Sequence, residues 1–369
     1  MNSELISSQL FTVHPLRPFF APSRSFAEFI LERSEGLKDK LCERLLNYLK
    51  MRIFLTGASG CIGHYIAETL IQETDHELFL LVRNPKKIQF DYKARPGVTL
   101  LEGDLREIEK YRDLLKTIDV AILTATSWGG AEESFDINVR KTISLMNLLD
   151  PNTCQQVIYF STASILDCHN QLLEQAGQIG TDYIRTKYEC FTQLDELKIA
   201  NKITTIFPTL VIGGDKNKPY SHLSSGLPDV VKWIDLIRWF KADGSFHFIH
   251  ARDIAQVVKY LVEHPPTESE AISSRQFVLG NKRLTVDRAI EEICDYLGKK
   301  IYFRLPLSIG LANFFIKVFR IQMAPWDRFC LDSRHFTYEN PVNPATFGLP
   351  NYCPTLTDVL KITGIPQKR

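Results

Sequence analysis

The sequence predicts an α/β fold, in which a Rossmann-type doubly wound parallel sheet is followed by a smaller C-terminal part. Three observations support this prediction. A glycine-rich turn joins a short apolar run to a helical pattern at residues 57–63, apolar runs and helical patterns alternate over 78–212, and 369 residues suit one large α/β unit. Hydrophobic residues make up 44% and charged residues 24% of the chain, which is ordinary for a globular protein.

Residues 1–50 differ from the rest, because they show no strand pattern and precede Met51, which opens the first strong apolar run. We favour a translation-start extension upstream of a native start at Met51. A targeting segment is an open alternative, since residues 1–25 are Ser-rich and contain one acid, Glu4. The third alternative is a native helix over 26–50. We expect a cytoplasmic protein, or one of an organelle stroma if residues 1–50 are a targeting segment.

Composition restricts the partners. The formal net charge of +1 gives no field that favours nucleic acid. Eight cysteines form no C-x-x-C pair, which indicates reduced thiols and no metal site. No apolar run is long enough to span a membrane, and 309–319 is expected to form an amphipathic helix. Peripheral membrane contact through Phe314, Phe315 and Phe319 stays an alternative.

The first element is a strand over 52–56, followed by the turn at 57–63 and a helix over 64–72. Glycines let a backbone approach phosphates closely, and the N–H groups at a helix N-terminus can donate to them. The segment therefore predicts a site for the pyrophosphate of a nicotinamide dinucleotide. Its expected contacts are Thr56, Gly57, Ser59, Gly60, Cys61, Ile62 and Gly63.

Further strands are predicted at 78–82, 98–105, 119–125, 156–162 and 203–212, with a helix over 136–149. Ligands of open α/β sheets bind at the carboxyl ends of the strands. The end of the fourth strand, Thr124-Ala125, is therefore expected beside the cofactor.

The spacing G-x-x-G-x-x-G after Thr56 resembles the extended short-chain dehydrogenase/reductase family, the NAD-dependent epimerase/dehydratase group. The resemblance continues in order from about Met51 to Leu297. It implies that Asp104 and Leu105 pass the adenine. It also implies that Asn138, in the family's N-V-x-x-T helix, and Pro208, at the end of the sixth strand, bind the cofactor. Family members often form dimers, so a homodimer is an open expectation.

The residue at the end of the second strand indicates whether the protein prefers NAD or NADP, because it lies near the 2′ position of the adenosine ribose. NAD-binding members usually carry an acid there, which accepts a hydrogen bond from the ribose. This chain has Arg83 instead, with Lys86 and Lys87 close by in sequence. A guanidinium can pair with a 2′-phosphate, so NADP is preferred and NAD is the alternative.

A second motif, a tyrosine followed four residues later by a lysine, predicts general acid/base catalysis. Tyr183 and Lys187 form a Y-x-x-x-K pair, one turn apart on one helix face. A lysine ammonium favours the phenolate of a neighbouring tyrosine, which otherwise titrates near ~10. The resemblance implies that Tyr183 is the general acid/base, that Lys187 also holds the nicotinamide ribose, and that Thr162 orients the substrate oxygen. Ser161 and Ser164 are the alternatives to Thr162.

The chain contains another Y-x-x-x-K at 296–300, which is interrupted by Gly298 and is typical of a helix C-terminus. Position therefore selects Tyr183. In the segment 246–255, Asp253 is expected to cap a helix over 254–261, and His250 is expected to be structural.

The predicted parts are the extension 1–50, an NAD(P)-binding domain 51–212 and a substrate-binding part 213–369, from which 246–262 and 276–280 return to the first domain. Two departures from the family, Phe207 for arginine and Leu166 for tyrosine, fall near the substrate. The expected activity is an NAD(P)-dependent oxidoreductase or epimerase/dehydratase acting on a small molecule. The alternatives are a non-catalytic NAD(P)-binding subunit or sensor, and a reductase of an apolar, sterol- or isoprenoid-like alcohol.

Overall fold

The computed structural model describes residues 50–266, 275–318, 320 and 322–367. By its contacts the chain divides into Met1–Lys50 and Met51–Arg369, and the fold described below is that of the second unit. The expectations for residues 1–49 and for Phe319 lie outside the described residues.

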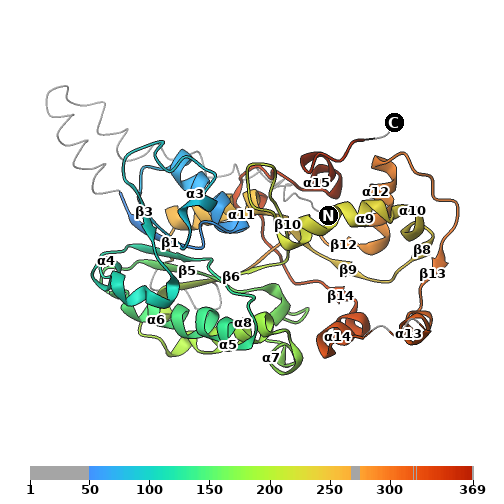
Figure 1. Ribbon diagram of the computed structural model, residues 1–369, viewed down its shortest axis with the longest axis horizontal. Helices are drawn as coiled ribbons and strands as arrows, with labels where there is room; N and C mark the ends of the chain where they lie inside the picture. Colours follow the sequence, from blue (N-terminus) through green and yellow to red (C-terminus); the bar gives the residue numbers. More distant parts are fainter. Residues whose placement is uncertain (1–49, 267–274, 319, 321, 368–369) are drawn as a thin grey trace, which may run out of the picture. The chain divides into compact units, whose positions relative to one another are not determined.

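The centre of the unit is a seven-stranded sheet in which every neighbouring pair of strands is parallel, as Figure 1 shows. The strand order is β11-β6-β5-β4-β1-β2-β3. This order confirms the Rossmann-type fold. The strands are β1 (Arg52–Thr56), β2 (Glu77–Val82), β3 (Val98–Glu102), β4 (Val120–Leu123), β5 (Gln156–Phe160), β6 (Ile203–Pro208) and β11 (Gln276–Leu279).

Helices cover both faces of this sheet, because successive side chains of a strand point to opposite faces. Ile53 and Leu55 pack in the core under α3 (Cys61–Glu73) and α11 (Ala251–Glu263). Phe54 packs in a second core on the opposite face. That face is covered by α4 (Arg112–Leu115), α5 (Ala131–Phe135), α6 (Thr142–Leu148) and α8 (Asp182–Thr192), as Figure 1 shows.

Shorter elements connect the strands and helices. They are η1 (Pro85–Lys87), η2 (Leu105–Tyr111), η3 (Asp136–Lys141), η4 (Ala163–Ile165), α7 (Glu174–Ile179), η5 (Leu194–Glu196) and η6 (Ala200–Lys202). The helix predicted over 136–149 begins earlier, at Ala131, and passes through a π-helical segment, η3, before α6 ends at Leu148.

The C-terminal part contains short strands and helices around a third core, in which α12 packs against α15. Its strands pair as β10-β7, β12-β9-β14 and β13-β8. The strands are β7 (Leu210–Ile212), β8 (Phe240–Lys241), β9 (Ser245–Phe246), β10 (Phe248–His250), β12 (Leu284–Thr285), β13 (Leu305–Pro306) and β14 (His335–Phe336). The helices are α9 (His222–Lys232), α10 (Ile234–Ile237), α12 (Val286–Tyr296), α13 (Ile309–Val318), α14 (Pro325–Ser333), η8 (Pro344–Phe347) and α15 (Leu356–Ile362).

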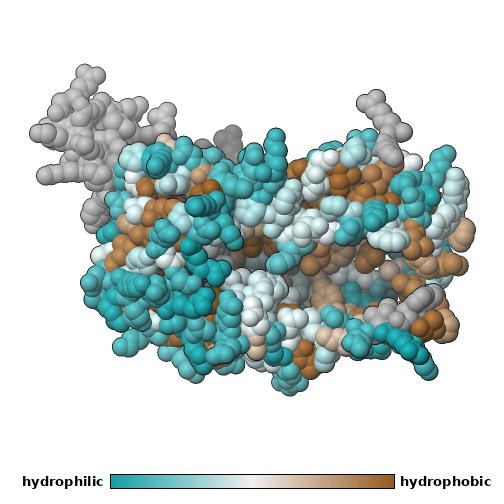
Figure 2. All heavy atoms as spheres, in the orientation of Figure 1, coloured by the Kyte–Doolittle hydropathy of each residue, from teal (hydrophilic) through white to brown (hydrophobic). Residues whose placement is uncertain are grey.

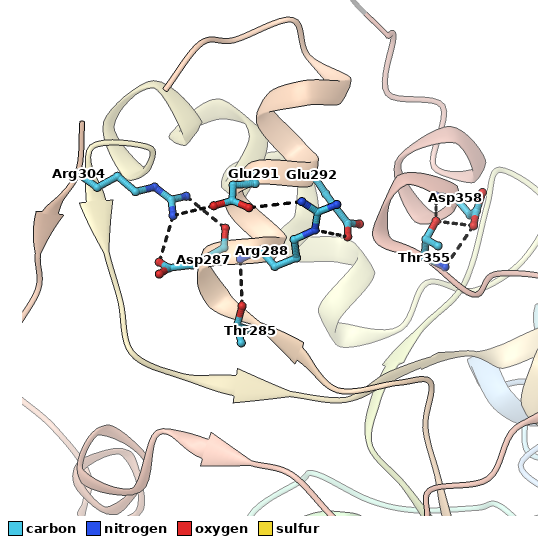
Figure 3. Close-up of polar contacts among 8 residues, drawn as sticks. All are labelled: Thr285, Asp287, Arg288, Glu291, Glu292, Arg304, Thr355 and Asp358. Carbon is cyan, nitrogen blue, oxygen red and sulfur yellow. Dashed lines mark hydrogen bonds and ion pairs between the residues drawn. The ribbon is translucent and has the colours of Figure 1, made fainter. Parts of the chain in front are cut away.

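Ion pairs fix the segment after α12 to that helix, as Figure 3 shows. The Arg304 guanidinium lies 3.3 Å from the Asp287 carboxylate and 3.6 Å from that of Glu291. It also donates to the Asp287 carbonyl oxygen at 3.2 Å. Because Arg304 immediately precedes β13, these contacts hold β13 beside the start of α12.

The expected cap at Asp253 is wrong. Helix α11 begins at Ala251, and its cap is His250, whose Nδ1 accepts from the Arg252 N–H at 3.1 Å. Asp253 is fully buried within the helix, where its carboxylate accepts from the Tyr352 and Cys353 N–H groups at 2.6 and 3.1 Å. Hydrogen bonds to an ionised carboxylate are stronger than hydrogen bonds to a neutral acceptor. The two bonds of Asp253 therefore hold the C-terminal segment against α11.

The second Y-x-x-x-K motif lies at the end of a helix, as predicted. Helix α12 ends at Tyr296, and Gly298 has a φ of +64°, which confirms that this motif is a helix C-terminus.

The helix expected at 309–319 is α13, where Phe314 is exposed. Over the described residues, no helix is both long and apolar enough to cross a membrane.

Candidate active site

The glycine turn forms a tight backbone junction between β1 and α3. Gly57 has a φ of +79°, and a Cβ there would lie 2.6 Å from Thr124 Oγ1. A Cβ on Gly63 would collide with the Gly57 carbonyl group, so helix and turn approach too closely for any side chain. The shape of the turn therefore depends on these two glycines.

The outer side of the turn is open to a ligand. Gly60 is exposed and precedes α3, which has neither a side-chain cap nor an acidic residue in its first turn. Ser59, Cys61 and Ile62 are partly exposed around it. Unsatisfied N–H groups at a helix N-terminus attract anions, so the turn fits a pyrophosphate.

The carboxyl ends of β1 and β4 are bonded together beside this turn. Thr124 Oγ1 donates to the Thr56 carbonyl oxygen at 2.6 Å, and the Ala125 N–H donates to Thr56 Oγ1 at 3.2 Å. Thr56 is buried, whereas Thr124 and Ala125 are partly exposed. Pro208, also buried, ends β6 at the same edge. The structure thus brings the predicted residues of β1 and β4 together.

The ends of β2 and β3 carry the residues expected near the adenosine. Asp104 Oδ1 accepts from the backbone and side chain of Arg106 at 2.8 and 3.2 Å. Burial favours the neutral carboxyl, but these bonds and the charges of Arg106 and Arg83 hold the pKa of Asp104 below its usual range. Leu105 is buried and Arg83 is exposed. Arg83 is therefore accessible to a ligand phosphate.

Tyr183 and Lys187 lie on α8, as the spacing predicts. Lys187 is buried, its Nζ donates to the Phe160 carbonyl oxygen at 2.7 Å, and it lies 6.0 Å from the centre of the Tyr183 ring. Burial lowers the pKa of Lys187 to about 8. Burial also raises the pKa of Tyr183 to about 12, although a hydrogen bond with Thr162 offsets part of this effect. The tyrosine is therefore protonated at neutral pH in the cofactor-free protein.

Thr162 follows β5 and caps η4, and its Oγ1 accepts from the Ser164 N–H at 3.3 Å. Its hydroxyl also lies 3.3 Å from Ser164 Oγ. Ser161 is buried, and its Oγ has no hydrogen-bond partner among the described residues. Of the three hydroxyls, Thr162 is the one whose interaction with Tyr183 lowers the pKa of that tyrosine.

Asn138 organises the loop after β4. Its Oδ1 accepts from the Ser127 N–H at 2.8 Å and from Thr126 Oγ1 at 2.9 Å. Its Nδ2 donates to the Ser127 carbonyl oxygen and to Thr186 Oγ1, both at 3.0 Å. Asn138 thus connects this loop to α8, one residue from Lys187.

Trp128 lies in this loop and was missed by the sequence reasoning. Its indole stacks on the ring of Tyr183, with centroids 3.8 Å apart and planes at 14°. It also contacts His222 at 4.9 Å, although 55% of its surface is exposed. A tryptophan beside Gly129 and Gly130, just after a strand end at the ligand-binding edge, was the available signal.

The two departures from the expected family pattern are both buried in an apolar cluster. Phe207 and Leu166 are 1% and 5% exposed, and Trp326 of α14 belongs to the same cluster. Tyr183 packs against this cluster from its edge. The space near the tyrosine is therefore bordered by apolar side chains. Figure 2 shows that the face drawn is hollowed near its centre, with hydrophobic residues exposed in the hollow.

The fold and the turn define a dinucleotide-binding protein of the Rossmann class. The pattern of the NAD dependent epimerase/dehydratase family matches residues 53–280, so the chain belongs to that family.

Curated relatives match over short segments. The chain is 35% identical over 100 residues to isoflavone reductase homolog A622-like of Nicotiana tabacum, which covers 26% of this chain and 31% of the relative. It is 23% identical over 123 residues to short-chain dehydrogenase/reductase family 42E member 1 of Xenopus laevis, covering 32% and 31%. The chain thus spans about a third of the length of these curated relatives.

Solved structures share the fold over much more of the chain. The structure of gox2253 superposes with a TM-score of 0.60 at 18% identity and covers 85% of this chain and 97% of its own. The Bordetella bronchiseptica enzyme WbmG, in complex with NAD and UDP, superposes with a TM-score of 0.56 at 14% identity, covering 84% and 93%. These similarities confirm the fold.

Proposed function

We propose that this protein is an NADP(H)-dependent reductase that interconverts a ketone and a secondary alcohol. The observation that carries the proposal is the Tyr183–Lys187 pair, placed with Thr162 at the same sheet edge as the glycine turn. Family membership supports dinucleotide-dependent chemistry in general. Epimerases and dehydratases use the same hydride and proton transfers, so these activities are the alternatives.

In this proposal some residues bind the cofactor and others orient the substrate or transfer the proton. The turn at 57–63 would hold the pyrophosphate, and Lys187 would hold the nicotinamide ribose. When bound, the reduced cofactor supplies a hydride to the carbonyl carbon of the substrate. Thr162 orients the carbonyl oxygen, and Tyr183 gives its hydroxyl proton to that oxygen, which completes the alcohol. Lys187 stabilises the phenolate that remains until a proton from solvent restores it.

The buried hydroxyl of Tyr183 suits the role of proton donor. Burial raises the pKa of Tyr183 to about 12, so the hydroxyl keeps its proton near pH 7, as a donor to the substrate oxygen requires. In the oxidation of an alcohol, the same residue would have to act as the phenolate.

Arg83 supports NADP(H) over NAD(H), since its exposed guanidinium stands at the end of β2. Lys86 and Lys87 in η1 are also exposed and add positive charge to this corner. Asn138 acts as a positioning residue in this proposal, because both ends of its amide are bonded within the protein.

The test combines binding with turnover. Thermal-shift titration of the wild-type protein with NAD, NADH, NADP and NADPH should show the largest stabilisation by the NADP pair. A panel of ketones, including keto-sugar nucleotides and apolar ring ketones, is then assayed for NADPH oxidation. Tyr183→Phe should lower turnover by about a hundredfold or more and leave NADPH binding intact. Full activity of this variant would refute the assignment, and a protein that binds NADPH but reduces no ketone would favour the sensor alternative.

A further inference from the structure

The exposed tryptophan above the proposed proton donor requires a physical explanation. Trp128 exposes 55% of its surface, so burial in a core does not explain its presence in the loop. Its position is nevertheless well defined, because it stacks on Tyr183 at a centroid distance of 3.8 Å. An aromatic side chain held open beside the group that meets the substrate can stack on a flat ring of that substrate.

The loop that carries Trp128 is held on both sides of the indole. Before it, the Ser127 backbone makes two hydrogen bonds with the Asn138 amide, at 2.8 and 3.0 Å. After it, the Gly129 N–H donates to Ser127 Oγ, which in turn donates to Glu133 at 3.1 Å. The loop therefore presents the indole in a fixed place, which lowers the entropy lost when a ligand binds.

Apolar and aromatic groups approach Tyr183 from more than one element. His222, the first residue of α9, contacts the indole at 4.9 Å. The cluster that contains Phe207 and Trp326 also packs against Tyr183. Groups of this kind recognise flat rings by stacking and apolar contact, with ring centroids typically ~4.5–7 Å apart.

We propose that Trp128 is a specificity-determining residue, which selects substrates that have a flat, apolar aromatic ring joined to the reacting carbon, because that ring can stack on the indole next to Tyr183. This inference rests on the proposed function, because it takes Tyr183 as the group that meets the substrate oxygen. It narrows the substrate class to secondary alcohols and ketones whose reacting carbon is joined to an aromatic ring.

The test uses two secondary alcohols with the same carbon skeleton. 1-Tetralol has a flat aromatic ring joined to the alcohol carbon, whereas 1-decalol is its fully saturated, puckered counterpart. Both are titrated calorimetrically into the protein with and without saturating NADPH, a reduced cofactor that cannot oxidise either alcohol. The wild-type protein should bind 1-tetralol roughly tenfold more tightly than 1-decalol.

Variants then assign this preference to the indole. Trp128→Leu keeps an apolar side chain without a flat face, and it should bind both alcohols about equally. Trp128→Phe keeps a smaller flat face and should retain part of the preference. Trp233→Ala removes another tryptophan with the same 55% exposure and should behave as wild type. Thermal unfolding of each variant verifies that the fold is intact.

Two results would overturn the inference: a wild-type protein with no preference for 1-tetralol over 1-decalol, or a Trp128→Leu protein that keeps the full preference. Neither result depends on turnover. The Tyr183→Phe assay can therefore fail while the ring preference holds, and the preference can fail while Tyr183 proves essential.

Discussion

The glycine turn at 57–63 and the surface around Trp128 lie at the same edge of the sheet, but different parts of the chain define them. The turn is shaped by backbone: Gly63 meets the Gly57 carbonyl so closely that no side chain fits between them. The other surface is shaped by side chains, and Trp128 remains 55% exposed on a loop that side-chain hydrogen bonds of Asn138 and Glu133 hold in place. The turn can therefore accept little variation, whereas the exposed indole can be replaced without a steric clash.

The largest effect is expected at the turn. Gly63→Ala should lower NADPH affinity by about a hundredfold and destabilise the protein by roughly 2 kcal/mol or more, because helix and turn must separate. Gly60→Ala is the matched control for stability. A Cβ there would meet only the Gly57 carbonyl oxygen, at 3.4 Å, so this protein should fold normally. Calorimetric titration with NADPH measures the affinity of each variant, and thermal unfolding measures its stability. A Gly63→Ala protein that binds NADPH as tightly as the wild type would contradict the proposed sensitivity of the turn.

Asn138→Ala tests whether this residue positions the Trp128 loop and α8 or contacts the cofactor directly. Loss of the amide releases Ser127 and Thr186 together, so the Trp128 loop and α8 should shift relative to each other. We expect turnover to fall by roughly tenfold to a hundredfold, since small displacements of reacting groups are costly. NADPH affinity should change less than about threefold if the role is positioning. A larger loss of NADPH affinity with unchanged turnover would make Asn138 a cofactor contact instead.

Arg83→Ser should weaken NADPH binding by roughly tenfold and leave NADH binding unchanged, because only NADPH offers a 2′-phosphate to the guanidinium. Separate titrations with the two cofactors give the ratio of dissociation constants. Lys93→Ser, on the exposed loop before β3, serves as a charge-matched control. If Arg83→Ser alters both affinities equally, the assignment of the 2′ site is wrong.

The smallest effect concerns acid stability, which should reside in the cofactor-binding half. Burial lowers the pKa of His64 on α3 to about 4, so the unfolded chain binds more protons below its own value of about 6.5. Stability is therefore lost as pH falls from about 6.5 toward 4, by roughly 1 kcal/mol in the first pH unit. His64→Leu should flatten the dependence of the unfolding temperature on pH in this window.

The exposed His169 supplies a control of opposite sign. A hydrogen bond with Glu339 raises the pKa of His169, so this contact stabilises the fold at low pH and is lost as pH rises. His169→Gln should lower acid stability slightly. A His64→Leu protein as acid-sensitive as wild type would exclude the buried imidazole as the cause.

Sequence patterns predicted the first region better than the second, for physical reasons. A strand, three glycines and an apolar helix are consecutive, so their relation is visible locally. The position of Trp128 depends on Asn138 and Thr186, which come from two other elements. Asp253 shows the same limit: its spacing suited a helix cap, but it bonds to Tyr352 and Cys353, about a hundred residues further along the chain. The roles of the individual site residues stay predictions.

The order of the strands has a consequence for how the chain acquires its structure. Strand β6 ends at Pro208 and its neighbour β11 begins only at Gln276, so the intervening residues emerge from the ribosome before the sheet receives its last strand. Parallel pairing over such a separation is slow, because closing a long loop costs chain entropy before the stabilising contacts between the strands form. The exposed edge of β6 is then open to wrong partners during synthesis, and nascent chains that stop before β11 should be the species most prone to aggregate.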